Sequence, residues 1–147
     1  MTTAQTGTSL RVSRVIRADP ETVFRAWTEP GQLSRWSAPE GVDVDCAEVD
    51  LVVGGRYRIR MKNPEGQEFN AVGVYQRIDR PHLLSYTWQW EEQEHNVGET
   101  LVTVQFYDRG GATEVVLVHE RFPTAEDMAK HEQGWSSCVN RLEVMFA

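Results

Sequence analysis

Two histidines in the second half of the chain have the side chains best suited to proton transfer. His131 shares a helical face with apolar residues, and His119 ends a strand pattern in register with apolar residues of the same strand. Imidazole titrates near neutral pH, so two such rings in one cavity could act as general acid and base. Asp50 and Glu120 are the nearest carboxylates that such a pair could use. The interpretation we favour is the simpler one, in which both rings are hydrogen-bonded core side chains.

Aromatic side chains point to a second kind of chemistry, the binding of a hydrophobic molecule. Five Trp and four Tyr are many for 147 residues, and buried indole and phenol groups need hydrogen-bond partners. A cavity holding a ligand would supply those partners. A protein–protein surface would do so too, and a filled core is the remaining alternative. The residues predicted to line a ligand cavity are Trp36, Tyr57, Ile59, Met61, Tyr86, Trp88, His119, Met128, His131 and Trp135. Trp90, in the same strand pattern as Trp88, could line it as well.

The sequence contains no motif for metal, nucleotide or covalent chemistry. Its four histidines lack the spacing at which three or four ligands converge on one ion, so no metal site and no cofactor are expected. Gly54-Gly55 does not belong to a GxxxxGK[ST] phosphate loop, and no GxSxG nucleophile motif is present. Cys46 and Cys138 are far apart and fit no CxxC pattern, so both thiols are expected to be free.

The charge balance argues against polyanionic partners. The chain has 15 Lys and Arg against 22 Asp and Glu, which gives a net charge of -7, and this acidity disfavours non-specific binding to nucleic acid or anionic membrane. The only candidate for a basic patch is the alternating series Arg56, Arg58, Arg60 and Lys62. We interpret it as a solvated outer face. Docking of an acidic partner, or self-association into a homodimer, is the alternative.

The location of the chain is predicted from what its sequence lacks. Residues 1–9 have neither the basic start nor the apolar stretch of a secretory signal. No run approaches the roughly 20 apolar residues of a membrane span. The sequence therefore predicts a cytoplasmic protein with reduced thiols, with residues 1–8 as a disordered tail and residues 9–147 as one domain.

Capping and turn signals divide the chain into the elements that must position these side chains. Asp19-Pro20-Glu21 is a helix start, and Thr124 with Asp127 resembles a capping box. The predicted elements are a strand over 10–16, helices over 19–30 and 31–36, strands over 42–53, 56–62, 68–78, 84–90, 101–107 and 113–120, and a final helix. An antiparallel sheet with one apolar face must be covered, and the final helix is the only long amphipathic element available.

The apolar face of the final helix contains an unexpected glycine. The residues that share this face are Met128, His131, Trp135, Cys138, Leu142 and Met145. Gly134 in mid-helix costs about 1 kcal/mol relative to Ala. Either the helix approaches the sheet closely at this point, which is the interpretation we prefer, or the glycine leaves room for a ligand beside Trp135.

Several stretches along the chain match a known family in type and order. They are Ala18–Thr28, Leu33–Trp36 with Pro39, Asp50 with Gly54–Tyr57, Gly73–Tyr75 with Ile78, Leu84–Trp88, and Gly134-Trp135 with Leu142. On these stretches the chain from Val12 to Phe146 resembles the activator of heat-shock-protein ATPase family, within the START or Bet v 1-like (SRPBCC) superfamily. The resemblance implies an α+β helix-grip fold, in which a curved antiparallel sheet of about seven strands wraps around a long C-terminal helix, with two short helices after the first strand.

The residues and the resemblance together suggest three functions, and each of these functions predicts a different geometry. Binding of a small hydrophobic molecule, lipid-like or aromatic, predicts a nearly closed cavity of several hundred cubic ångströms and ranks first. A cyclase, aromatase or hydrolase predicts that His119 or His131 faces a cavity beside a carboxylate or tyrosine hydroxyl. A co-chaperone-like interaction module predicts a filled core and an exposed apolar patch.

Overall fold

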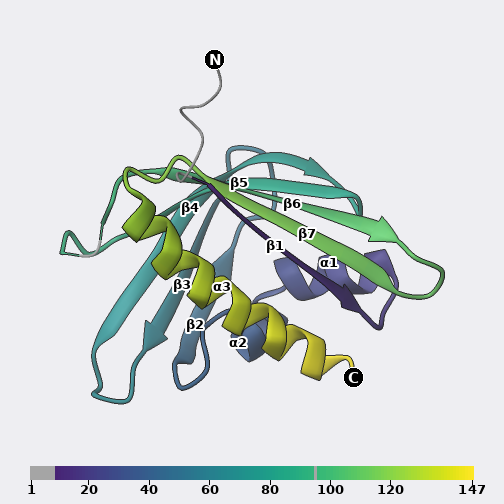
Figure 1. The fold of residues 1–147 in the computed structure, drawn as a ribbon, viewed down its shortest axis with the longest axis horizontal. Coiled ribbons are helices and arrows are strands. Elements are labelled where there is room, and N and C mark those ends of the chain that lie inside the picture. The colour runs from purple at the N-terminus through teal and green to yellow at the C-terminus, as the bar shows by residue number, and fades with distance from the viewer. Residues whose placement is uncertain (1–8, 95) are drawn as a thin grey trace.

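The structure is a computed structural model that describes residues 9–94 and 96–147, and its centre is a seven-stranded antiparallel sheet (Figure 1). The strands are β1 (Leu10–Ile16), β2 (Asp43–Val49), β3 (Arg56–Lys62), β4 (Glu68–Asp79), β5 (Leu83–Trp90), β6 (Thr100–Asp108) and β7 (Thr113–Glu120). They lie in the order β1-β7-β6-β5-β4-β3-β2. The first two strands of the chain are therefore the two edges of the sheet.

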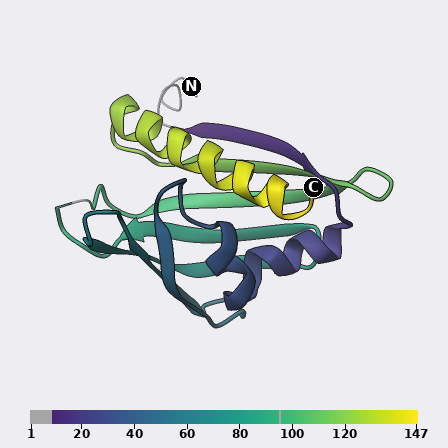
Figure 2. The same ribbon diagram turned by 90° about the horizontal axis from the view of Figure 1, so that it is seen from below.

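Three helices complete the fold. The two short ones, α1 (Pro20–Thr28) and α2 (Pro30–Trp36), connect β1 to β2, and the long α3 (Ala125–Met145) ends the chain. The sheet curls around α3, which runs diagonally across its inner side, while α1 and α2 lie toward one end (Figures 1 and 2). This arrangement confirms the predicted α+β helix-grip fold. Within the described residues, no helix is both long and apolar enough to cross a membrane.

The predicted capping signals form the helix starts. The Asp19 side chain accepts a hydrogen bond from the backbone N–H of Thr22 at 3.2 Å, and Pro20 occupies the first helical position. At the start of α3, the Thr124 hydroxyl oxygen accepts from the Asp127 N–H at 3.1 Å. Each contact satisfies an amide group that has no partner within its own helix, so both helices begin where the sequence predicts.

β2 ends earlier than the sequence predicts, at Val49 instead of at residue 53. The chain turns back on itself here, because the N–H of Val52 bonds to the Asp50 carbonyl and that of Gly55 to the Val52 carbonyl, both at 2.8 Å. The turn leaves Val52 and Val53 with exposed fractions of 54% and 66%. Two valines that looked like strand residues therefore lie on the surface of a loop.

The alternation in β3 separates its apolar and basic side chains onto opposite faces of the sheet. Arg58 forms an ion pair with Glu91 at 2.7 Å, and Arg60 lies 3.8 Å from Asp45. These basic side chains are partly exposed and their charges are balanced by neighbouring carboxylates, as expected of a solvated outer face. The buried residues of the strand are Tyr57, Ile59 and Met61.

Gly73 of β4 is required by a close approach between strands. It pairs with Tyr57 in the β3–β4 ladder, and the Tyr57 hydroxyl donates a hydrogen bond to the Thr87 carbonyl at 2.6 Å. A Cβ atom at position 73 would lie 1.9 Å from that carbonyl oxygen and 2.6 Å from the tyrosine oxygen. Only glycine leaves space for this buried hydrogen bond.

We expect Gly73→Ala to lower the free energy of unfolding by about 3 kcal/mol, because the new methyl group overpacks the sheet and displaces the Tyr57 hydroxyl from its acceptor. Urea denaturation followed by tryptophan fluorescence measures the change. Gly31→Ala is the matched control, since a Cβ at position 31 meets no atom within 4 Å. A Gly73→Ala protein as stable as this control would contradict the requirement for glycine.

Candidate functional site

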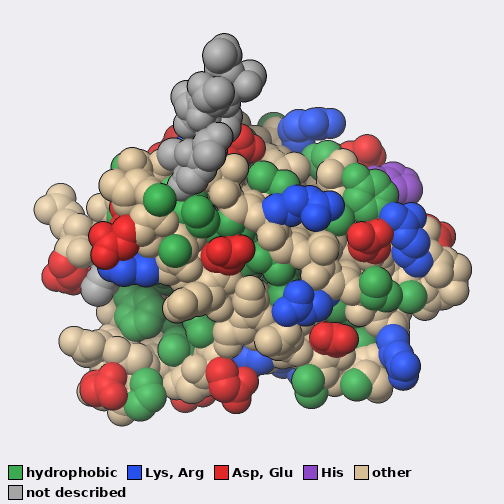
Figure 3. Space-filling view, in the orientation of Figure 1, with side chains coloured by type: hydrophobic (Ala, Val, Ile, Leu, Met, Phe, Trp, Pro, Cys, Tyr) green, Lys and Arg blue, Asp and Glu red, His purple; other side chains and the backbone are tan. Residues whose placement is uncertain are grey.

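A groove of about 530 Å³ opens between the N-terminal half of α3 and the inner sides of β3, β4 and β5. In the space-filling view, hydrophobic side chains are visible between this part of α3 and the β3–β4 hairpin (Figure 3). The volume lies in the usual range for small-molecule sites. The apolar side chains that line the groove include Met61, Phe69, Trp88, Trp90, Val97 and Trp135. Polar lining residues include Asn63, Gln67, Asn96, Lys130 and His131.

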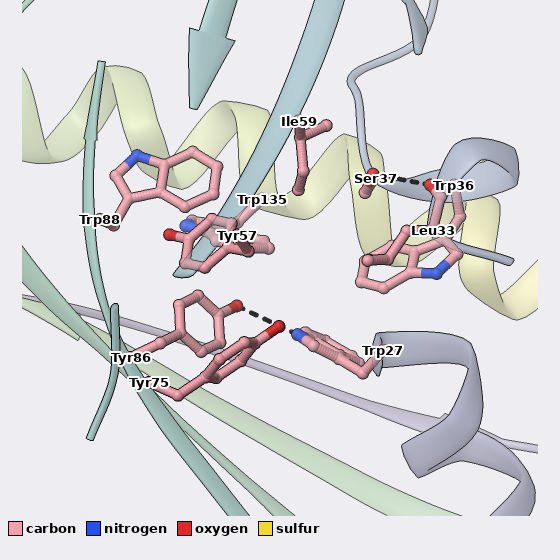
Figure 4. A pocket seen from close by; sticks show the side chains of 10 residues that line it. All are labelled: Trp27, Leu33, Trp36, Ser37, Tyr57, Ile59, Tyr75, Tyr86, Trp88 and Trp135. Carbon is pink, nitrogen blue, oxygen red and sulfur yellow. Dashed lines mark hydrogen bonds between the residues drawn. The ribbon is translucent and has the colours of Figure 1, made fainter. Parts of the chain in front are cut away.

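The space enclosed between the sheet and the helices is nearly filled. Its cavity has a volume of about 20 Å³, which is room for about one water molecule. Aromatic side chains point into this space from several elements (Figure 4), and the Trp27 indole N–H donates to the Tyr86 hydroxyl at 3.1 Å. The large, nearly closed cavity expected for a binding protein is therefore not found in the centre. The space large enough for a ligand lies instead in the open groove beside the centre.

The residues predicted to line one cavity fall into three groups. Five line the groove: Met61, Trp88, Trp90, His131 and Trp135. Four line the small inner cavity, together with Trp88 and Trp135: Trp36, Tyr57, Ile59 and Tyr86. His119 and Met128 line neither of these two cavities.

Phe69 and Trp90 complete the aromatic lining of the groove, and of these two only Phe69 was not predicted from the sequence. Phe69 lies directly opposite Met61 in the β3–β4 ladder. Trp90 continues the alternation of β5 beyond Trp88, and the two indoles meet edge to face with their centroids 5.6 Å apart. The alternation that includes Trp88 predicted Trp90 as well. Phe69 could have been found only from the strand register, which places it opposite Met61 across the predicted hairpin turn.

His119 links α3 to the sheet through a chain of hydrogen bonds. The Trp135 indole N–H donates to His119 Nδ1 at 2.9 Å. An indole nitrogen can only donate, so Nδ1 is the acceptor and the ring proton lies on Nε2. That nitrogen lies 2.7 Å from the Thr100 hydroxyl oxygen, to which it donates. The Thr100 hydroxyl in turn donates to the Trp88 carbonyl at 2.7 Å.

This network keeps the His119 ring neutral. Burial, with a smaller contribution from His131, holds the pKa of His119 well below its ordinary value of 6.5. A second proton would have to sit on Nδ1, where it would face the indole N–H of Trp135. Both ring nitrogens of His119 are therefore used inside the core, by a hydroxyl and an indole and not by a carboxylate.

His131 differs from His119, because one of its ring nitrogens has no hydrogen-bond partner among the described residues. Its Nδ1 lies 2.8 Å from the backbone carbonyl of Asp127 one turn earlier. Its ring packs against Phe122 and His119, at centroid distances of 4.8 Å and 5.5 Å. Burial lowers the pKa of His131, although the hydrogen bond to Asp127 works in the opposite direction. Nε2 is buried and has no hydrogen-bond partner among the described residues.

Gly134 lies in the wall of the groove and not against the sheet. Among the described residues, a Cβ atom at this position would meet a single atom within 4 Å, the Cγ of Pro39, at 3.9 Å. The preferred interpretation, a close approach of helix to sheet, is therefore wrong. The remaining interpretation, that the glycine leaves space beside Trp135, agrees with its position in the groove lining.

Comparison with known families gives a match over most of the chain. The family model of the Activator of Hsp90 ATPase homolog 1-like proteins matches residues 17–147. A comparison with curated protein sequences finds no match.

Solved structures with the same fold span nearly the whole chain. A protein from Chromobacterium violaceum is 26% identical, with 95% of this chain and 96% of that chain covered and a TM-score of 0.87. The AHSA1 protein from Silicibacter pomeroyi is 27% identical, with 93% and 96% covered and a TM-score of 0.83. An HSP90 activator from Plasmodium falciparum is 25% identical, with 94% and 95% covered and a TM-score of 0.72.

The buried neutral state of His119 predicts a pH dependence of stability. The unfolded chain binds a proton at this residue below its ordinary pKa of 6.5, whereas the folded chain does not. The contribution of neutral His119 to the free energy of unfolding is therefore fully present above that pH, and it declines as the pH falls through it. We expect His119→Gln, which stays neutral, to reduce this decline by up to about 1.4 kcal/mol per pH unit.

Urea denaturation between about pH 7 and about pH 5 measures this slope. His82→Gln is the control, because His82 is exposed, and it should keep the slope of the unmodified chain. Equal slopes for His119→Gln and the unmodified chain would show that His119 is charged in the folded protein.

Proposed function

The chain belongs to the Activator of Hsp90 ATPase homolog 1-like family of the SRPBCC superfamily, and from this premise we propose that it binds a small hydrophobic molecule in the groove beside α3. The observation that carries the proposal is an apolar groove of about 530 Å³ in a molecule whose central space is otherwise filled. Soluble proteins bury large aromatic side chains when they can, so a concave surface built of them is typical of a binding site.

The aromatic walls of the groove form one connected cluster. Phe69 and Trp90 meet with ring centroids 5.4 Å apart, Trp90 and Trp88 at 5.6 Å, and Trp88 and Trp135 at 5.4 Å. The rings are inclined to one another by 50° to 74°, so both ring edges and ring faces are available. A hydrophobic molecule lying in the groove would extend this cluster and remove apolar area from water.

Gly134 supports the same proposal from the side of the helix. A glycine in the middle of a helix costs about 1 kcal/mol relative to alanine, and the described residues around it would accept a Cβ atom. The packing of the fold therefore gives no reason for a glycine here. A molecule lying against the helix backbone beside Trp135 does give one.

We expect freshly purified protein to carry a co-purifying small molecule, which native mass spectrometry detects as an added mass that denaturing extraction removes. Gly134→Leu should lose this mass with little loss of stability, because its side chain would occupy the groove. Adding the extracted molecule back should change the tryptophan fluorescence, since three indoles line the groove.

Gln133→Leu is the matched control for this experiment. It adds the same side chain at the next position of α3, which is exposed and is not part of the groove lining. It should retain the bound mass. A clean mass for the unmodified protein, without a fluorescence response to fatty acids, flavonoids and polyketide-like aromatics, would sink the proposal.

Activation of a heat-shock-protein ATPase is a second candidate function. It is favoured by the similarity to the HSP90 activator from Plasmodium falciparum. It is also favoured by the exposed valines of the β2–β3 loop, Val52 and Val53, since exposed apolar side chains grouped on a loop are typical of contact surfaces for other proteins.

The second function predicts that the chain accelerates ATP hydrolysis by an Hsp90-type chaperone. The double variant Val52→Asp, Val53→Asp should lower the acceleration several-fold, because charged side chains would oppose burial of the loop. Gly134→Leu should leave it unchanged. A steady-state ATPase assay that shows no acceleration by the unmodified chain would remove this function.

A further inference from the structure

We propose that the ligand of the groove is an aromatic molecule with a hydroxyl group, and that this hydroxyl donates a hydrogen bond to Nε2 of His131. The inference rests on the proposed function of the groove and adds the chemical class of the ligand. It is derived from the polar atoms that the fold leaves unpaired in the groove lining.

The tautomer of His131 follows from its partner. The backbone carbonyl of Asp127 can only accept a hydrogen bond, so Nδ1 of His131, at 2.8 Å from it, carries the proton. In the neutral ring, Nε2 is then a lone-pair acceptor. Helix α3 therefore fixes the ring so that Nε2 can only accept a hydrogen bond.

The described part of the fold supplies no such donor. Two neighbouring rings have polar atoms, His119 at a centroid distance of 5.5 Å and Trp90 at 6.4 Å. Both nitrogens of His119 are bonded to Trp135 and Thr100, and the Trp90 indole N–H forms no hydrogen bond with His131 Nε2. Phe122, packed on another side of the His131 ring, has no polar side-chain atom. Buried polar atoms are nearly always paired in folded proteins, so an unpaired acceptor in a groove wall indicates a ligand donor.

The same groove lining contains an unpaired donor. The indole N–H of Trp88 is buried and has no acceptor among the described residues, and Trp88 lines the groove with His131. A hydroxyl group donates and accepts, so hydroxylated molecules suit a lining with one free acceptor and one free donor. A deprotonated carboxylate has no proton to donate to His131 Nε2.

The rest of the lining selects an aromatic skeleton. Trp88, Trp90 and Trp135 present indole edges and faces, against which flat rings pack in offset or edge-to-face geometry. Gly134 leaves the helix backbone uncovered next to Trp135, so a planar molecule can approach α3 closely. His131 Nε2 is shielded from solvent, so a neighbouring side chain has to shift for the hydroxyl to reach it, as side chains at binding sites commonly do.

Matched ligand pairs test the inference, with isothermal titration calorimetry as the readout. The pairs are 2-naphthol with 2-methoxynaphthalene, and 6-hydroxyflavone with 6-methoxyflavone, in which the ether replaces the donor hydrogen with a methyl group. We expect the unmodified protein to bind each hydroxyl compound about tenfold more tightly than its ether. His131→Phe should abolish this preference, and His131→Gln, whose amide oxygen can accept, should restore part of it.

A second readout separates a hydrogen bond from a packing effect. In a ¹⁵N spectrum of the imidazole groups, 2-naphthol should shift the Nε2 resonance of His131, whereas 2-methoxynaphthalene should not. Equal binding of both members of each pair, or a preference that survives in His131→Phe, would overturn the inference and leave the proposed function standing. A co-purifying molecule without a hydroxyl group would do the same. No binding of any compound, with no co-purifying mass, would remove the proposed function and this inference together.

Discussion

The hydrogen bond from Trp135 to His119 joins the long helix to β7 of the sheet, and the arrangement of the site depends on it. It continues through Thr100 to the backbone of Trp88, so that α3, β7, β6 and β5 are tied in one line. Because an indole can only donate, the direction of each bond in the line is fixed. Trp88 and Trp135 are thereby held as a wall, with the filled core on one side and the open groove on the other.

This wall explains how one fold can contain both a packed centre and a cavity of ligand size. The side chains of Tyr57, Tyr86 and Trp36 fill the space under α1 and α2, where other proteins with a similar sheet could use smaller residues and keep a hollow. In the groove, α3 has a glycine at position 134, which leaves space beside the helix. The facing β3–β4 hairpin has Met61 and polar side chains at its turn, and the space between them stays open. The fold sets the frame, and side-chain size decides where volume remains.

The features that could be predicted from the sequence are those set by interactions between residues close together in the chain. The alternation in β3 and the capping residues Asp19 and Thr124 act over a few residues, and both were predicted correctly. The position of the groove depends on which rotamers the rings adopt after elements distant in sequence come together. The sequence therefore indicated many lining residues without dividing them between two cavities, and it favoured the wrong explanation for Gly134. Phe69 required knowledge of strand register to be found.

At Gly134, the stability of the protein and the ligand binding that we propose place opposite demands on one residue. Alanine at this position would strengthen α3 by about 1 kcal/mol, and of the residues that the structure describes it would touch only the ring of Pro39. Laboratory evolution for heat resistance alone would therefore favour filling this position, with the groove narrowing as the melting temperature rises. Thermostable variants selected without a ligand present would be expected to give up binding first at this turn of the helix, while the rest of the fold improves.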